Sequence, residues 1–364
     1  MYHRSFVSIP VVLLAASLAW ACSGDGTGPG GGSGNNPPPD TASTTPPVTL
    51  RSRAEAHDLY VGSAAATGLN RGDAAYADTL AAEFDMVTPE NAMKFDATHP
   101  QPGLYTFAAG DTIVAFAEKN GMKVRGHTLV WQNQLPDWVR NGTWTKQSLS
   151  DTLKAHIQNV VGHYKGKIHA WDVVNEPFNG DGTLQSNIFL QTIGPDYIEL
   201  AFRWAHEADP DAKLYLNEYG AEDMGTKSDS LYALVSRLKA DGVPIDGVGM
   251  QMHLATQYGA PSTTDLAANM KRLGDLGLKV EITEMDVRTA VPTTADGVAK
   301  QVQMYRDVVG ACRAASNCDA IVFWGFTDKY SWVPSTFTGQ GAALLYDASY
   351  HRKETFAAVL DALQ

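Results

Sequence analysis

Two glutamates lie at the ends of apolar runs that are rich in β-branched residues. Glu176 belongs to AWDVVNEP (170–177), and Glu284 belongs to KVEITEMDV (279–287). Runs of this kind are typical of interior strands in a parallel sheet, and α/β barrels place their chemistry at the carboxyl ends of such strands. We therefore expect the two carboxyl groups to face one cleft. Paired carboxylates are the arrangement that hydrolysis of a glycosidic bond uses.

Amide, imidazole, carboxylate and indole side chains follow the other apolar runs as well. They lie in TPENAMK (88–94), GHTLVWQNQLPDW (126–138), LNEYG (216–220), GMQMH (249–253) and WGFTDKYSW (324–332). Indole faces stack on sugar rings, and the polar groups hydrogen-bond ring hydroxyls, so this mixture favours a neutral carbohydrate ligand. A cofactor phosphate would need a Gly-rich loop or a basic cluster. The sequence contains neither, and we expect no cofactor.

Eight short strands separated by helical patterns would place these segments at one end of a barrel. The predicted strands are Leu59–Gly62, Phe84–Val87, Lys123–Gly126, His169–Val174, Lys213–Asn217, Asp246–Met250, Lys279–Thr283 and Ala320–Trp324. Amphipathic helical patterns begin at Asp111, Ser148, Tyr197 and Ser230. Eight alternations predict an α/β fold, a single (β/α)8 TIM barrel. An open doubly wound sheet is the alternative, although no G-x-G-x-x-G follows the first strand.

The composition excludes several classes of partner. The chain has 364 residues and a formal net charge of −12, with no run rich in Lys or Arg. Neither nucleic acid nor an anionic membrane surface is therefore expected as a partner. From residue 50 to residue 364 the composition is uniform and shows no internal repeat. We interpret 50–364 as one catalytic domain and expect a monomer.

The first 49 residues differ from the rest. Residues 1–21 combine Arg4, a short apolar stretch and small residues near Cys22, which is typical of a signal peptide. Residues 22–49 consist almost wholly of Gly, Pro, Ser, Thr, Asn and Asp, the composition of a flexible linker. The segment L-A-W-A-C resembles a bacterial lipobox, so Cys22 is a lipidation candidate. The protein would then be exported and attached to the cell surface or outer membrane, with full secretion as the alternative.

The other two cysteines are close together in sequence. Cys312 and Cys318 flank a short segment, and in an exported protein this spacing favours a small-loop disulfide. Two buried free thiols are the alternative. A disulfide leaves Cys22 as the odd cysteine, and lipidation would use that thiol without an intermolecular partner.

In this order and spacing, the segments resemble glycoside hydrolase family 10, the endo-β-1,4-xylanases, over essentially all of 50–364. The resemblance rests on HTLVW, WDVVNEP, the Q-x-H of residues 251–253, the segment around Glu284 and the W-G-x-x-D-x-x-S-W of residues 324–332. It implies endo-hydrolysis of xylan with retention of configuration, through a covalent glycosyl-enzyme. Gln132 departs from the family pattern after HTLVW, and Pro177 departs from it after Glu176.

The resemblance also implies a role for each matching residue. Glu176 matches the acid/base and Glu284 the nucleophile. The residues that match the substrate-binding set are Glu90, Asn91, Lys94, His127, Trp131, Gln134, Asn175, Gln251, His253, Trp324, Asp328 and Trp332. Asp328 matches a carboxylate that supports the wall formed by the two tryptophans.

Three other functions remain open at the level of sequence. The same barrel can hydrolyse β-1,4-glucan, either cellulose or a mixed-linkage glucan. A tethered polysaccharide-binding protein without catalysis is the second possibility, although such proteins typically lose one carboxylate and both are present here. A metal-dependent hydrolase using His127 and His253 is the third. The histidines lack H-x-H or H-E-x-x-H spacing, and we expect no metal.

Overall fold

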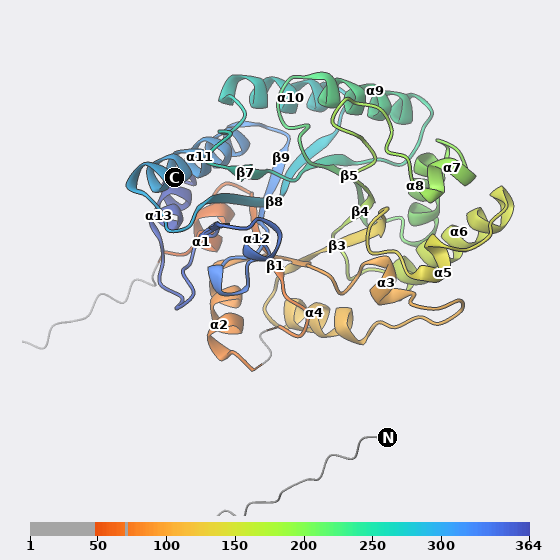
Figure 1. Cartoon of the computed structure of the whole chain (residues 1–364), viewed down its shortest axis with the longest axis horizontal. Coiled ribbons are helices and arrows are strands. Elements are labelled where there is room, and N and C mark those ends of the chain that lie inside the picture. The colour runs from red at the N-terminus through yellow and green to blue at the C-terminus, as the bar shows by residue number, and fades with distance from the viewer. Residues whose placement is uncertain (1–47, 70–71) are drawn as a thin grey trace, which may run out of the picture. The chain divides into compact units, whose positions relative to one another are not determined.

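The computed structural model describes residues 48–69 and 72–364 (Figure 1). The described residues belong to one compact unit. The predicted signal peptide, the lipidation candidate Cys22 and nearly all of the predicted linker lie outside the described residues. The first described helix, α1 (Leu50–Glu55), begins with a capping box in which the Thr49 hydroxyl accepts a hydrogen bond from the Ser52 backbone N–H.

Parallel strands form a closed barrel at the centre of this unit. The barrel strands are β1 (Tyr60–Ala65), β2 (Met86–Pro89), β3 (Lys123–Val130), β4 (Ala170–Asn175), β5 (Lys213–Glu218), β6 (Gly247–Met250), β8 (Lys279–Ala290) and β9 (Cys318–Phe323). Neighbours pair in the order β8-β6-β5-β4-β3-β2-β1-β9, and β9 pairs with β8 to close the ring. This closure excludes the open doubly wound sheet and confirms the predicted barrel.

Helices surround the strands (Figure 1). After α1 they are α2 (Ala74–Glu83), α3 (Phe95–Thr98), α4 (Ala108–Lys119), α5 (Asp137–Arg140), α6 (Lys146–His163), α7 (Ile188–Thr192), α8 (Tyr197–Ala208), α9 (Thr226–Ala240), α10 (Thr263–Asp275), α11 (Ala295–Ala314), α12 (Val333–Thr336) and α13 (Glu354–Ala362). Helix α6 illustrates why they form. Thr145 caps its first turn, and its buried residues Leu149, Leu153, Ile157 and Val160 recur at helical spacing.

The eight predicted strands are all present, and several are longer than predicted, most of all β3 and β8. Strand β8 continues from Lys279 to Ala290, so Glu284 lies within the strand rather than after it. Its pairing with β9 shifts register between Ile282 and Met285, which is a local bulge at the glutamate. Two short strands were not predicted, β7 (His253–Ala255) and β10 (Gln340–Gly341). Both pair with the extension of β8.

A disulfide joins Cys312, near the end of α11, to Cys318, at the start of β9. This confirms the predicted pairing, and the alternative of two free thiols is wrong. Within residues 48–69 and 72–364, no helix is both long and apolar enough to cross a membrane.

Candidate active site

One cleft collects the side chains that follow the barrel strands. It has a volume of about 540 Å³ and is lined by Glu90, Asn91, Lys94, His127, Trp131, Gln134, Asn175, Glu176, Tyr219, Gln251, His253, Glu284, Arg288, Trp324, Trp332 and Phe337. Each predicted catalytic or substrate-binding residue except Asp328 is in this set. The carboxyl ends of β2 to β6, the extension of β8 and the loop after β9 supply them, as expected for a barrel of parallel strands.

Glu284 is buried and held by several donors. Its side chain accepts a hydrogen bond of 2.7 Å from the Asn217 amide, and His253 Nε2 lies 3.1 Å from its other oxygen. His127 Nδ1 lies 3.9 Å from Glu284 Oε1. Burial opposes ionisation of this carboxyl, but the hydrogen bond from His253 and the charges on both histidines outweigh it and lower its pKa. The surroundings of Glu284 therefore favour its ionised form.

His253 links Glu284 to a second acid. Its Nδ1 lies 3.0 Å from Asp286 Oδ2, and Trp332 Nε1 donates a 2.7 Å hydrogen bond to the same oxygen. Burial alone would lower the pKa of His253, but the carboxylates of Asp286 and Glu284 raise it to about 10. An imidazolium between two carboxylates results, and it fixes the orientation of Glu284 and of the Trp332 indole together.

A buried network of charged side chains supports His127. His127 Nδ1 lies 2.9 Å from Asp172 Oδ2, and Arg125 forms ion pairs with both Asp172 and Glu281. Arg125 is fully buried. Because each buried charge here has an opposite partner, the network can persist inside the barrel and hold the imidazole in one orientation.

Glu176 has a different environment. It follows β4 with a positive φ of 55°, an uncommon conformation for a residue with a side chain. The Trp131 indole donates a 2.8 Å hydrogen bond to one carboxyl oxygen, and the Gln251 amide donates a 3.0 Å bond to the other. Gln132, where the sequence departs from the family pattern, donates to the backbone oxygen of Glu176 and to the Gln185 side chain.

An amide chain connects the two glutamates. The Asn217 amide donates to Asn175 Oδ1 as well as to Glu284, and Gln251 Nε2 lies 3.2 Å from the same Asn175 oxygen. Thr283 donates to Asn217 Oδ1, which fixes the amide orientation. Asn175 is left with its amide N–H groups as the donors it can offer to a ligand.

A second polar group lies at the ends of β2 and β3. The Lys94 ammonium donates to Asn91 Oδ1 at 3.0 Å and to Gln134 Oε1 at 2.7 Å. It also lies 4.9 Å from the centre of the Trp131 ring. Burial lowers the pKa of Lys94 and raises the pKa of Glu90, and the opposite charges of the pair moderate both shifts. The group presents several hydrogen-bonding atoms beside an indole face, which suits a sugar ring.

Asp328 is the one predicted site residue that does not line the cleft. Its carboxylate accepts hydrogen bonds from Lys353 Nζ at 2.8 Å and from the Leu344 backbone N–H at 2.9 Å. Both oxygens are thus engaged within the fold, and the residue is absent from the cleft lining. These contacts fit the supporting role that the resemblance implies for Asp328, and a contact between Asp328 and a ligand stays a prediction.

Several residues that line the cleft or contact its lining had no role assigned from sequence. Asn217 and Tyr219 lie in LNEYG, a segment that the strand-end pattern had already marked, so a local signal existed for both. Asp286 follows Glu284 at an alternate position of the same strand. Arg288 and Phe337 had no such signal, because the first depends on the extension of β8 and the second on a loop after β9.

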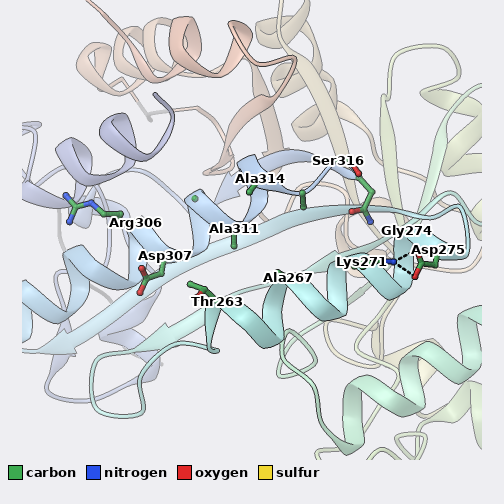
Figure 2. Close-up of a pocket in the computed structure, with 13 residues that line it drawn as sticks. Thr263, Ala267, Lys271, Gly274, Asp275, Arg306, Asp307, Ala311, Ala314 and Ser316 are labelled. Carbon is green, nitrogen blue, oxygen red and sulfur yellow. Dashed lines mark hydrogen bonds and ion pairs between the residues drawn. The ribbon is translucent and has the colours of Figure 1, made fainter.

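A larger depression lies elsewhere, in a groove between α10 and α11 on the outside of the barrel (Figure 2). Its volume is about 810 Å³, and small residues such as Ala267 and Ala311 line it beside the Lys271–Asp275 ion pair. Neither Glu176 nor Glu284 is part of it, so volume alone does not identify the active site. In the described part of the chain, no group of three or more His, Cys, Asp or Glu side chains is arranged to hold a metal ion.

A TIM barrel whose cleft is polar and aromatic and contains two glutamates with different hydrogen-bond partners defines a glycoside hydrolase site. The model of "Glycosyl hydrolase family 10" matches residues 49–362. The chain belongs to glycoside hydrolase family 10.

Relatives support this membership. Endo-1,4-beta-xylanase A of Phanerodontia chrysosporium is 45% identical over 300 residues, covering 82% of this chain and 72% of that protein. The crystal structure of xylanase 10B from Thermotoga maritima is 43% identical with a TM-score of 0.85, covering 87% of this chain and 98% of that one. Xylanase 10B from Thermotoga petrophila, solved in complex with xylobiose, is 42% identical with a TM-score of 0.85, covering 88% and 98%.

Proposed function

We propose that this chain is an endo-1,4-β-xylanase that cleaves xylan with retention of configuration. The observation that carries the proposal is the pair Glu176 and Glu284, which line one cleft in a family 10 barrel but have contrasting hydrogen-bond partners. The similar proteins from Phanerodontia chrysosporium and Thermotoga neapolitana are both named endo-1,4-beta-xylanases, and this supports xylan as the substrate.

In the first half-reaction, Glu284 attacks the anomeric carbon while Glu176 gives a proton to the departing glycosidic oxygen. The bond between the anomeric carbon and that oxygen breaks as an ester to Glu284 forms. The His253 imidazolium and the Asn217 amide hold Glu284 ionised and oriented for attack. An ester oxygen is a weaker hydrogen-bond acceptor than a carboxylate oxygen, so both donors interact most strongly with the free carboxylate.

In the second half-reaction, Glu176 accepts a proton from water as that water attacks the anomeric carbon. The ester to Glu284 breaks, and the product leaves with its original configuration after two inversions. The Trp131 and Gln251 donors keep the Glu176 carboxyl in one place for both steps. One side chain can then serve first as acid and later as base.

The remaining polar residues are proposed to bind the sugar chain. Asn175 offers its amide to a hydroxyl beside the reacting carbon, and Trp324 and Trp332 wall the same sugar. Glu90, Asn91, Lys94, His127 and Gln134 would bind the sugars on the non-reducing side. The crowding expected from Trp332 and Gln134 favours xylose, which has no hydroxymethyl group, over glucose.

Parallel product analysis on arabinoxylan, cellulose and mixed-linkage glucan tests the substrate. We expect short xylo-oligosaccharides from arabinoxylan and far less product from the two glucans. Comparable release from a glucan would favour the alternative of a β-1,4-glucanase. A protein that binds xylan but releases no reducing ends would instead be the tethered binding protein.

The destination of the protein is a separate proposal. The sequence of residues 1–49 supports export with attachment through a lipid on Cys22, and the xylanase would work as a monomer. Labelling with a radioactive fatty acid, compared between wild type and Cys22→Ser, tests the anchor. A label that persists in Cys22→Ser, or no label in wild type, would reject the lipid on Cys22 and favour full secretion.

A further inference from the structure

Lys94 and Arg288 are the Lys and Arg side chains that line the cleft, and their surroundings differ. The Lys94 ammonium is engaged by Asn91 and Gln134. Within residues 48–69 and 72–364, no carboxylate forms an ion pair with Arg288, and the one hydrogen bond that its side chain donates is a 3.4 Å contact from Nη1 to the Leu254 backbone oxygen. Its Nε is buried without a hydrogen-bond partner. The Arg288 guanidinium therefore lines the cleft without a carboxylate partner from the described residues.

Phe337 holds this guanidinium in place. The Arg288 Cζ lies 3.9 Å from the centre of the Phe337 ring, within the range of a cation–π interaction. The ring covers one face of the planar group. With Nε buried and one N–H of Nη1 donated to Leu254, the remaining N–H groups of Nη1 and Nη2 are left for a ligand. A guanidinium presented in this way matches the two oxygens of a carboxylate better than it matches a neutral hydroxyl.

The nearest acid on the same strand does not take that role. Asp286 and Arg288 are two residues apart in β8 and so point to the same face. The Asp286 Oδ2 is already engaged by His253 and Trp332 on the side of the nucleophile. Asp286 thus serves the catalytic cluster, and the charge of Arg288 is left for a ligand.

The position of Arg288 suggests which part of a polysaccharide it meets. It lies four residues beyond Glu284 in an extended strand, or about 13 Å along the strand axis. The main chain of a bound xylan must pass beside Glu284, at the floor of the cleft. A residue at this height on the wall would contact a side group that projects from the main chain.

We propose that Arg288, backed by Phe337, binds the carboxylate of a uronic acid side group on xylan. This proposal rests on the proposed xylanase function. Glu90, Glu176 and Glu284 repel an anionic side group, and the Lys94 ammonium and His253 imidazolium are already engaged by protein groups. A cation on one wall offsets that repulsion at one position, and it would select the orientation in which a substituted xylan enters.

The test compares three oligosaccharides with the same xylose main chain. The first carries a uronic acid, the second carries the same side group after chemical reduction of its carboxyl to an alcohol, and the third is unsubstituted. For wild type we expect kcat/KM on the acidic form to exceed that on the reduced form about tenfold, the size of a charge-assisted hydrogen bond. Added salt should diminish this ratio.

Two variants and a control locate the effect. Arg288→Met should bring the ratio of the acidic to the reduced form to about one and leave the unsubstituted oligosaccharide within about twofold of wild type. Arg288→Lys should keep part of the ratio, because it retains the charge but loses the planar fork. Arg306→Met removes the same charge at the outer groove and should leave the ratio as in wild type.

Equal losses on all three oligosaccharides in Arg288→Met would overturn the proposal in favour of a packing role. A wild-type ratio of one would also overturn it. If wild type hydrolyses none of the three, the proposed function fails, and calorimetric binding of the acidic and reduced forms to wild type still decides this inference. Tighter binding of the acidic form, lost in Arg288→Met, supports the uronate site, and equal binding rejects it.

Discussion

Glu176 and Glu284 are the same type of residue in the same cleft, but the barrel surrounds them differently. Glu284 sits inside a strand, is 4% exposed, and receives a hydrogen bond from an imidazolium that is itself held by Asp286. Glu176 sits at a turn after its strand and is partly exposed, and its two side-chain donors, Trp131 and Gln251, are neutral.

The difference suits the two chemical tasks that we propose for these identical side chains. A nucleophile must be ionised at the moment of attack, and a charged donor favours the ionised form strongly. An acid/base must gain and lose a proton in each cycle, and neutral donors can position it with less bias toward one form. Experiments that exchange or remove these partners test the comparison directly.

The largest effect is expected for Glu284→Ala. Loss of the nucleophile should lower kcat on xylan by about 10⁴-fold or more, as for other covalent catalysts. Azide should restore turnover by attacking from the vacated side, and the product should have inverted configuration by NMR. Rescue with retained configuration would contradict the assignment and exchange the roles of the two glutamates.

A smaller and selective effect is expected for Glu176→Ala. Proton donation contributes about 10²–10⁴-fold, so activity on xylan should fall by that amount. Cleavage of an aryl xylobioside with a good leaving group should fall far less, because that leaving group needs no proton. The ratio of the two losses is the measurement, and equal losses would count against an acid role.

The charged partner can be removed without touching either glutamate. In His253→Asn, Glu284 loses the donor that lowers its pKa, so the acidic limb of the kcat/KM profile should move to higher pH. A shift of about one pH unit is expected from one charge-assisted hydrogen bond. Asp286→Asn leaves the imidazole in place and should give an intermediate shift. An acidic limb that stays at its wild-type position would show that His253 does not control the nucleophile.

The smallest effect is expected when a neutral partner of Glu176 is removed. Trp131→Phe keeps an aromatic face in the cleft but loses one hydrogen bond, which should lower kcat/KM about three- to tenfold. The acidic limb of the pH profile should stay in place, because Trp131 does not contact Glu284. A shift as large as that of His253→Asn would contradict the contrast between neutral and charged partners.

Much of the fold and of the candidate site could be predicted because the signals are local. The apolar runs before Glu176 and Glu284 mark buried parallel strands, and the polar segments after the other runs mark the end of the barrel where the cleft lies. The proximity of Cys312 and Cys318 indicated their disulfide in the same way. In each case the informative residues are close together in the chain.

Three features could not be predicted in this way. They are the bulge that places Glu284 within β8, the ion pair between Asp328 and Lys353, and the link from His253 through Asp286 to Trp332. Each of them depends on segments that meet only when the ring of strands closes. Sequence by itself determined which residue types stand at the strand ends, because alternation and hydrophobicity are properties of neighbouring residues. Tertiary structure decided which of them touch, because hydrogen bonds and ion pairs depend on distances that the closed barrel sets between remote parts of the chain.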